Sequence, residues 1–297
     1  MRQMLFLYNP TAGKGRARDH LATVTEAFTR SGWLVTVYPT QGKGDAAALA
    51  AELEGGPFER VVCCGGDGTL HEVVEGLMTL EGRPEVGYIP AGSTNDFAQN
   101  LSLPRSYEKM ALTAAAGVPR PCDVGRFNDR CFIYVAAFGA FTDVAYDTPQ
   151  EFKNMFGHLA YLLEGIARLP AIKSYPLTVE YDGGTVEDEF IFGMVSNTVS
   201  VGGVKGLTGR DVKLDDGLFE VVLIKRPEQP GDLQSVLRSF LQQSPDERGR
   251  VVGIRTSRLK ISCGEELPWT LDGEYGGAPR VARIENCRGA VTIVHGK

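Results

Sequence analysis

The sequence predicts a doubly wound α/β domain over residues 1–120, followed by an antiparallel β-sandwich domain over residues 121–297. Three observations support this fold class. Apolar strand-like runs alternate with amphipathic helical stretches in the first 120 residues, which is typical of a parallel sheet covered by helices. Strand-like segments then follow one another closely, with only two helical stretches between them. The length of 297 residues is also long for a single hydrophobic core and sufficient for two domains.

The first domain begins with a continuous apolar run at residues 4–8, which fits a strand buried on both faces. Apolar residues at helical spacing follow from Leu21 to Phe28. Asp45 is placed to cap an alanine-rich helix that ends near Leu53. The remaining predicted elements are strands at residues 33–38, 61–64 and 86–89, and helices carrying Leu70 to Leu77 and Phe97 to Leu101.

The second domain is predicted to consist mainly of strands. Asp182, Gly183 and Gly184 separate two of them and favour a tight hairpin. Two helices are predicted, at about residues 157–169 and 231–243, and the last strand is compatible with a return to the first domain. The predicted strands span residues 131–137, 177–181, 186–192, 218–225, 259–263, 281–285 and 291–294.

Composition excludes several classes of protein. The balance of 31 basic and 37 acidic residues gives a net charge of −6, which argues against general adsorption to nucleic acid or anionic membranes. The longest apolar stretch, residues 131–141, is shorter than the ~18 residues that span a bilayer. The six cysteines show no CxxC spacing, and Cys63 and Cys64 are adjacent within an apolar strand. We therefore expect a cytoplasmic protein with reduced thiols and no nucleic-acid partner.

Three glycine-containing turns follow predicted strands of the first domain. Open parallel sheets bind ligands at the carboxyl ends of their strands, so these turns are candidate binding loops. The first turn could equally be an ordinary connection, and it lacks the spacing of a Walker A motif. It reads Asn9-Pro10-Thr11-Ala12-Gly13-Lys14-Gly15.

The second turn joins a buried strand directly to an amphipathic helix and carries three glycines. Exposed backbone N–H groups and the partial positive charge of a helix N-terminus favour a phosphate group here. An aspartate beside a phosphate is explained if Mg²⁺ lies between them. The alternative is that Asp67 or Thr69 only caps the helix. The turn reads Gly65-Gly66-Asp67-Gly68-Thr69.

The third turn presents small, hydroxyl-bearing and amide residues that suit phosphate or ribose oxygens. Asp96 could cap the next helix or orient a substrate or metal. The turn reads Pro90-Ala91-Gly92-Ser93-Thr94-Asn95-Asp96-Phe97.

In this order and spacing, NPTAGKG, GGDGTLHEVVEGL and PAGSTNDFAQNL resemble the catalytic domain of the diacylglycerol kinase superfamily, and most of all its small soluble bacterial members. The resemblance extends over essentially the whole chain. It implies a nucleotide-binding α/β domain, a β-sandwich domain and transfer of the ATP γ-phosphoryl group to a lipid hydroxyl. The nucleotide would be held by Asn9, Pro10, Thr11, Ala12, Gly13, Thr40, Gly65, Gly66, Asp67, Gly68, Thr69, Ser93, Thr94 and Asp96.

Two segments of the second domain extend the resemblance. The turn at Asp215-Asp216-Gly217 is similar to one that holds a structural Mg²⁺ in the family, which implies the Asp216 carboxylate and the carbonyls of Lys213 and Leu218 as ligands. Leu271-Asp272-Gly273-Glu274 matches a motif whose acidic residue takes the proton from the lipid hydroxyl. Glu274 is the first candidate for this base and Asp272 the second. Plain turns remain the alternative in both places.

The implied mechanism uses ATP and Mg²⁺, with Asp67 and Asp96 ordering the catalytic ion and Glu274 accepting the alcohol proton. The active site would lie in a cleft between the domains. The family pattern also has an Ala-Pro pair before its DDG turn, and Thr208, Gly209 and Arg210 stand there instead. This departure affects the lipid side and leaves the kinase motifs unchanged.

A lipid substrate implies reversible docking on a membrane surface. The predicted helix with Phe156, Leu159 and Leu162, flanked by Lys153 and Lys173, is one candidate surface, although packing against the sandwich explains it equally well. A homodimer through edge strands or helices is compatible with the sequence.

Two other functions compete with the lipid kinase. NAD kinases share GGDGT, and a non-catalytic nucleotide- or lipid-binding protein could keep the same fold. The segments GSTNDFA and LDGE favour the lipid kinase, and Asp67, Asp216 and Glu274 argue against a protein that has lost catalysis. The sequence does not distinguish diacylglycerol from phosphatidylglycerol, undecaprenol or a sphingoid alcohol.

Overall fold

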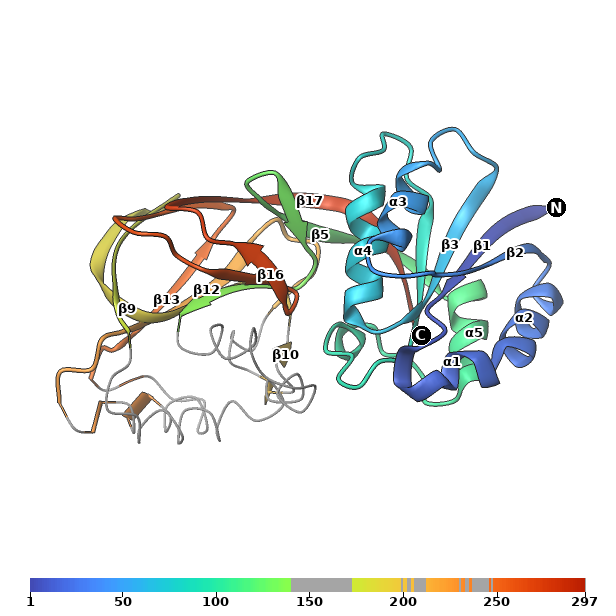
Figure 1. The fold of residues 1–297 in the computed structure, drawn as a ribbon, viewed down its shortest axis with the longest axis horizontal. Coiled ribbons are helices and arrows are strands. Elements are labelled where there is room, and N and C mark those ends of the chain that lie inside the picture. Colours follow the sequence, from blue (N-terminus) through green and yellow to red (C-terminus); the bar gives the residue numbers. More distant parts are fainter. Residues whose placement is uncertain are drawn as a thin grey trace. The chain divides into compact units, whose positions relative to one another are not determined.

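The computed structural model describes residues 1–139, 173–198, 200–201, 204–205, 212–229, 231–232, 235–236, 246 and 248–296. The chain divides into two compact units (Figure 1). Unit 1 contains Met1–Asp123 and Gly289–Lys297, and unit 2 contains Val124–Arg288. The chain therefore passes between the units twice, once within β5 (Val118–Phe127) and once within β17 (Val281–His295).

Unit 1 is a parallel sheet in the order β2–β1–β3–β4–β17. Helices α2 and α5 lie on one side of it, and α3 and α4 lie on the other (Figure 1). The strands are β1 (Arg2–Tyr8), β2 (Trp33–Pro39), β3 (Phe58–Gly65), β4 (Glu85–Pro90) and the end of β17. The helices are α1 (Arg16–Asp19), α2 (Leu21–Arg30), α3 (Asp45–Ala51), α4 (Asp67–Leu77) and α5 (Tyr107–Ala116), with single 3-10 turns η1 (Ala12–Gly15) and η2 (Phe97–Asn100).

The apolar runs of β1, β3 and β4 are buried because both faces of the sheet are covered. Met4, Phe6 and Tyr8 pack with Phe28 of α2 and with the alanines of α5. The alternate residues of these strands point to the other face, since side chains alternate along a strand. The three predicted central strands and the doubly wound arrangement are thus confirmed.

Two local predictions in unit 1 need correction, and one helix was not predicted. Gly44, with φ +84°, is the N-cap of α3, and the Asp45 carboxylate accepts the Gln41 N–H (2.7 Å) and the Tyr38 hydroxyl instead. The predicted helix around Phe97 is only the single turn η2. The sequence interpretation also missed α5, although the Ser106 hydroxyl accepts the Lys109 N–H at its start as an N-cap serine does.

Unit 2 is an antiparallel β-rich unit that encloses its own core of aromatic and aliphatic side chains, with Trp269 fully buried between Phe127 and Phe138. Its main strand order is β16–β15–β7–β9–β8–β14–β17, β12 joins β9 to β13, and β5 pairs with β6. The strands are β6 (Arg130–Phe132), β7 (Val135–Gly139), β8 (Tyr175–Tyr181), β9 (Gly184–Ser196), β12 (Phe219–Lys225), β13 (Val251–Thr256), β14 (Arg258–Cys263), β15 (Trp269–Leu271) and β16 (Glu274–Gly277), with the short pair β10 (Ser200–Val201) and β11 (Val204–Lys205).

The hairpin prediction at Asp182-Gly183 is confirmed, since Tyr181 and Gly184 pair directly in β8 and β9. Two other strand predictions change. The run at residues 131–137 is two strands, β6 and β7, separated at Ile133 and Tyr134. The two strands predicted at residues 281–285 and 291–294 are one strand, β17, which pairs antiparallel with β14 at its start and parallel with β4 near its end.

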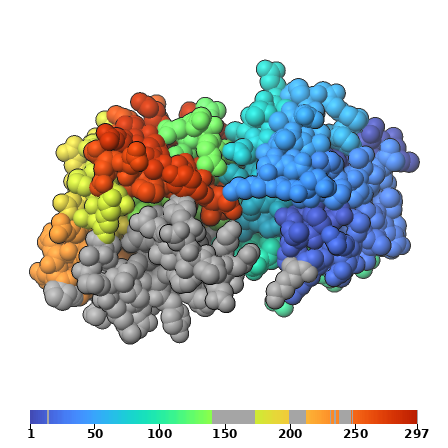
Figure 2. Space-filling model, in the orientation of Figure 1, coloured from blue at the N-terminus to red at the C-terminus, as the bar shows by residue number. Residues whose placement is uncertain are grey.

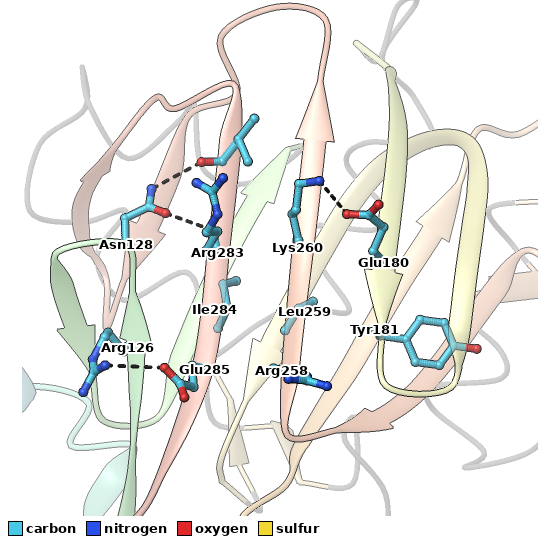
Figure 3. Close-up of a pocket in the computed structure, with 11 residues that line it drawn as sticks. Arg126, Asn128, Glu180, Tyr181, Arg258, Leu259, Lys260, Arg283, Ile284 and Glu285 are labelled. Atoms are coloured by element: carbon cyan, nitrogen blue, oxygen red, sulfur yellow. Dashed lines mark hydrogen bonds and ion pairs between the residues drawn. The ribbon is translucent and has the colours of Figure 1, made fainter.

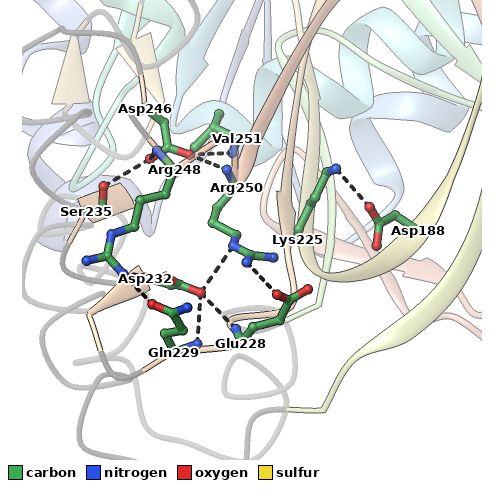
Figure 4. A network of polar contacts seen from close by, with 10 residues as sticks. All are labelled: Asp188, Lys225, Glu228, Gln229, Asp232, Ser235, Asp246, Arg248, Arg250 and Val251. Carbon is green, nitrogen blue, oxygen red and sulfur yellow. Dashed lines mark hydrogen bonds and ion pairs between the residues drawn. The ribbon is translucent and has the colours of Figure 1, made fainter.

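A polar network joins Glu228, Asp232 and Ser235 to the start of β13 (Figure 4). The Asp232 carboxylate accepts the N–H groups of Glu228 and Gln229 and pairs with Arg248 (2.8 Å) and Arg250 (3.1 Å). The predicted helix at residues 231–243 is described only at its beginning, and the one at residues 157–169, with the docking residues Phe156, Leu159 and Leu162, lies outside the described residues.

Within the described ranges, the helices are all too short or too polar to cross a membrane.

Candidate active site

Three loops of unit 1 meet at the carboxyl edge of its sheet. They follow β1, β3 and β4, and backbone hydrogen bonds continue the sheet into them: Asn9 N–H donates to Cys64 O (2.9 Å), and Ala91 N–H donates to Gly65 O (2.8 Å). In the sheet order β2–β1–β3–β4, the chain runs outward from β1 to β2 on one side and from β3 to β4 on the other. The direction of winding therefore reverses between β1 and β3. Such a switch point is where open α/β sheets bind ligands.

The loop after β1 is organised by Asn9. Its Oδ1 accepts the N–H (3.0 Å) and the hydroxyl (2.8 Å) of Thr11, and its Nδ2 lies 3.4 Å from Thr69 Oγ1 of the second loop. Gly13 has φ +58°, and a Cβ atom there would lie 2.1 Å from the Ala91 carbonyl oxygen of the third loop. The NPTAG segment therefore fits only because it contains glycine at the point of contact.

The loop after β3 leads into α4 through Gly66. No side chain caps the start of α4, although Asp67 and Thr69 lie in its first turn. A Cβ atom at Gly65 would lie 2.5 Å from Thr69 Oγ1, so the tight turn requires glycine. The N-terminus of α4 thus presents backbone N–H groups that are not bonded to a capping side chain, which suits a phosphate group.

The loop after β4 is tied to the second loop by the Asp67 carboxylate. Asp67 Oδ2 accepts the Asp96 N–H at 2.9 Å, and Oδ1 accepts the Phe97 N–H at 3.4 Å. Asn95 has φ +53° and bonds both backbone groups of Gly92, each at 2.8 Å. A Cβ atom at Gly92 would lie 2.6 Å from the Gly66 Cα, so the two loops touch through backbone atoms.

The structure brings the sequence-predicted residues of unit 1 together around this edge. Thr40 continues from β2 and donates its N–H to Tyr8 O (2.9 Å), so the end of β2 joins the same edge. Ser93 is exposed, Thr94 is half-buried, and Asp96 is buried. Asp67 and Asp96 provide two carboxylates in bonded loops, a donor set that suits Mg²⁺ together with nucleotide phosphates. The Asp67 side chain bonds the third loop, and Asp96, the N-cap residue of η2, makes no capping hydrogen bond with its own side chain.

The LDGE segment of unit 2 is a β15–β16 hairpin with a two-residue turn. Asp272 (φ +50°) and Gly273 (φ +85°) both adopt the left-handed conformation, as a type I′ turn requires. The buried Asp272 carboxylate accepts the N–H groups of Ile133 (2.7 Å), Tyr134 (3.0 Å) and Val135 (3.0 Å). These bonds also explain why the strand is interrupted between β6 and β7, since the N–H groups of Ile133 and Tyr134 bond to Asp272.

Glu274 follows the turn and is only half-buried. The segment that contains this hairpin, orange to red in Figure 2, forms part of the surface. The two acidic residues of the motif therefore differ. The Asp272 carboxylate is buried and bonded to the backbone before β7, whereas Glu274 is partly accessible to solvent.

The turn that was expected to hold a structural Mg²⁺ lies before β12. Asp216 Oδ1 accepts the Leu218 N–H (3.0 Å), and Oδ2 pairs with the guanidinium group of Arg255. Arg255 also pairs with Glu220 (3.3 Å), whose pKa is raised to about 7 by burial. The carboxylate is a suitable Mg²⁺ ligand, but Arg255 already supplies a positive charge there. Sequence reasoning missed Arg255 because it is 39 residues from Asp216.

A surface groove of about 690 Å³ lies on unit 2, over β8, β14 and β17 (Figure 3). Two ion pairs lie within its lining, Lys260 with Glu180 (2.6 Å) and Arg126 with Glu285 (3.4 Å), and Arg258 pairs with Asp182 (2.8 Å) outside it. It contains none of the residues predicted from the sequence motifs.

Comparisons with known proteins agree with these motifs. A family model described as the diacylglycerol kinase catalytic domain matches residues 3–127. A diacylglycerol kinase of Bacillus subtilis (strain 168) is 36% identical over 278 residues, which are 93% of this chain and 91% of that protein. A diacylglycerol kinase of Staphylococcus carnosus (strain TM300) is 32% identical over 271 residues, 91% of this chain and 88% of that protein.

Solved structures from Bacillus anthracis share the fold. One matches with a TM-score of 0.87 at 25% identity and covers 99% of this chain and 95% of its own. The crystal structure of a diacylglycerol kinase from the same organism matches with a TM-score of 0.79 at 24% identity and covers 99% and 97%.

Proposed function

Since this chain belongs to the diacylglycerol kinase family and is an ATP-dependent lipid kinase, we propose that the lipid it phosphorylates is diacylglycerol, with phosphatidic acid as product. The observation that carries the assignment of the site is the meeting of three loops at the N-terminus of α4, with Asp67 bonded to the backbone of the third loop. The relatives named diacylglycerol kinase support the choice of lipid.

The three loops would hold ATP through its phosphates. Phosphoryl transfer proceeds through a loose transition state, so the protein contributes mainly by positioning groups and neutralising charge. The N-terminus of α4 would face the phosphate chain, and Asn9, Thr40 and Thr94 offer hydrogen-bonding groups beside it. Asp67 and Asp96 would hold Mg²⁺, which neutralises phosphate charge when bound.

We assign the general base to Glu274. A base must be able to reach the substrate proton, and both carboxylate oxygens of the buried Asp272 already accept hydrogen bonds from three backbone N–H groups. Glu274 lies two residues away and is half-buried, and its carboxylate could accept the proton of the lipid hydroxyl. Asp272 would then act by fixing the hairpin that carries Glu274.

A second Mg²⁺ at Asp216, with the carbonyls of Lys213 and Leu218, would have to compete with Arg255. We propose that this turn is stabilised by the guanidinium group at low Mg²⁺ and admits the ion only when Arg255 moves aside.

The lipid substrate resides in a membrane, so we also propose reversible docking of the protein on the membrane surface. Sedimentation with phosphatidylcholine vesicles, with and without diacylglycerol, tests the docking, and sedimentation velocity measures whether the protein forms a homodimer.

The assay for the function is transfer of labelled γ-phosphate from ATP, with Mg²⁺, to short-chain diacylglycerol, phosphatidylglycerol, sphingosine, undecaprenol and NAD in separate reactions. We expect labelled phosphatidic acid from diacylglycerol and loss of this product in Asp67→Ala. Label in another lipid only would contradict the choice of diacylglycerol while keeping the lipid kinase. Label in NAD only would contradict the assignment as a lipid kinase.

A further inference from the structure

Tyr88 is fully buried in the sheet of unit 1, yet its hydroxyl group reaches the loops at the sheet edge. It lies in register with Cys63 of β3, which pairs with Leu7 of β1. Its neighbours along β4 face the other side: a Cβ atom at Gly87 would touch Ala114 of α5, and Ile89 packs in the core with α2 and α5. Tyr88 therefore points toward the face covered by α4.

The Tyr88 hydroxyl oxygen lies close to three acceptor oxygens: a backbone carbonyl at the end of β3, a side chain of the loop after β3 and a side chain of the loop after β4. It is 3.3 Å from Gly65 O, 3.5 Å from Asp67 Oδ1 and 3.5 Å from Asn95 Oδ1. A phenol donates only one proton, so these acceptors share it. The carboxylate is the only charged acceptor of the three, and hydrogen bonds to charged groups are the stronger ones.

The donors to Asp67 come from two directions. The N–H groups of Asp96 and Phe97 approach from the third loop, while the Tyr88 hydroxyl approaches from the sheet. Backbone donors alone fix where the third loop meets the carboxylate. The Tyr88 hydroxyl adds a contact from strand β4. The orientation of the Asp67 carboxylate therefore depends on the sheet as well as on the third loop.

We propose that Tyr88 is a positioning residue for phosphoryl transfer, whose hydroxyl group sets the orientation of the Asp67 carboxylate for Mg·ATP. The inference rests on the proposed role of the three loops, and it adds a residue that no sequence motif contains. Tyr88 acts through Asp67, whose Oδ1 lies 3.5 Å from the Tyr88 hydroxyl oxygen. Small displacements of a positioned group reduce the rate strongly, by up to about 10²-fold for a shift of about 1 Å.

The test is the variant Tyr88→Phe, which removes the hydroxyl group and keeps the ring in the core. We expect Mg·ATP affinity, measured by calorimetry without lipid, and kcat each to fall on the order of 10-fold, with the KM for diacylglycerol and the Tm unchanged. Tyr175→Phe is the matched control, since it removes the hydroxyl of a buried tyrosine of unit 2. Wild-type affinity and kcat in Tyr88→Phe would overturn the proposal, as would a loss that follows a lowered Tm.

A double-mutant cycle identifies the residue through which Tyr88 acts. In the Asp67→Asn background, Tyr88→Phe should weaken Mg·ATP binding no further, because the oriented charge is already absent. Additive effects of the two changes would overturn the proposed route through Asp67. The calorimetric test measures Mg·ATP binding without lipid, so it tests the role of Tyr88 independently of the lipid substrate. If the wild-type protein failed to phosphorylate diacylglycerol, the proposed substrate would be contradicted and the calorimetric test of Tyr88 would still hold.

Discussion

At the residue scale, the turn between β15 and β16 holds two acidic side chains with different surroundings. Asp272 is 4% exposed and bonded to three backbone N–H groups, and Glu274 is half-buried beside it. Their shared acidity makes them equivalent in the sequence. Burial and hydrogen bonding distinguish the two carboxylates, and the proposed roles give opposite expectations for their variants.

Glu274→Gln is expected to lower kcat by about 10²–10⁴-fold, the usual contribution of a general base, because an amide cannot accept the alcohol proton. The Tm and the calorimetric affinity for Mg·ATP should stay at wild-type values. Glu265→Gln is a suitable control, because Glu265 is an exposed glutamate of the same unit. Wild-type kcat in Glu274→Gln would assign the base elsewhere.

Asp272→Ala is expected to destabilise the protein by about 3 kcal/mol, since three buried N–H groups lose their acceptor. Asp272→Asn separates the loss of the negative charge from the strain of the left-handed backbone at φ +50°, because asparagine tolerates this backbone but carries no charge. Urea unfolding followed by circular dichroism measures both. Equal stability of wild type and Asp272→Ala would contradict the role assigned to these three bonds.

At the element scale, Arg60 of β3 holds the end of helix α5. Its Nη1 donates to the carbonyls of Ala114 and Ala115, both at 2.7 Å, and its Nε donates to Glu85 of β4 (3.0 Å). The side chain is 4% exposed and its guanidinium group lies 5.0 Å from the centre of the Trp33 ring. A positive charge at the carbonyl end of a helix is favourable, so one residue joins α5 to two strands.

Arg60→Ala is expected to lower the free energy of unfolding by about 3 kcal/mol, because Glu85 and the Ala114 carbonyl lose their buried partner while the Ala115 carbonyl keeps the bond from Trp33 Nε1. Arg2→Ala is the matched control. Arg2 also stacks on Trp33 and pairs with a glutamate, Glu59, but both charged side chains are more than half exposed. We expect Arg2→Ala to change stability by less than about 1 kcal/mol in the same urea titration.

The turn before β12 gives a second test at this scale. Arg255→Gln removes the cation that pairs with Asp216 Oδ2 and is therefore expected to increase the dependence of the Tm on Mg²⁺. The measurement is thermal unfolding of both proteins over a series of MgCl₂ concentrations, with NaCl at matched ionic strength as the control. An identical Mg²⁺ effect on both proteins would show that Arg255 does not compete for this carboxylate.

At the scale of the whole molecule, acid should affect unit 2 through carboxylates held ionised by their partners. The Arg248 side chain lowers the pKa of Asp232 to about 2. Ser257 lowers the pKa of Asp182, and Lys225 lowers that of Asp188. A carboxylate with a lowered folded-state pKa stabilises the fold above its unfolded value, near pH 4, and this contribution is lost as the pH falls toward 2.

The two tryptophans of the chain allow this to be measured in each unit, since Trp33 lies in unit 1 and Trp269 in unit 2. Trp33→Phe leaves a reporter for unit 2, and Trp269→Phe leaves one for unit 1. We expect the Trp269 fluorescence to change at a higher pH than the Trp33 fluorescence during acid titration. Asp232→Asn should reduce the dependence of unit 2 on pH between about 4 and 2. Coincident transitions for both reporters would mean that the units unfold together.

Local patterns determined much of this protein. The buried runs that became β1, β3 and β4 are continuous in the sequence, and the candidate binding loops follow them directly, so strand, turn and helix could be predicted from neighbouring residues. The tight turns at Gly13 and Gly65 also depend on residue type, because a side chain there would collide with backbone or side-chain atoms. Family, fold class and the set of candidate residues were therefore accessible from the sequence.

Only the tertiary structure decided what individual polar groups do. Asp67 meets the backbone of Asp96 across 29 residues, Asp272 meets Ile133 across 139, and Asp216 meets Arg255 across 39. No local pattern encodes such pairs, since the partners are brought together by strand order and packing. The same reason explains why Tyr88 looked like any buried strand residue, and why one strand, β17, was predicted as two. Short-range chemistry fixed the elements and the motifs, and long-range contacts fixed the roles of the side chains within them.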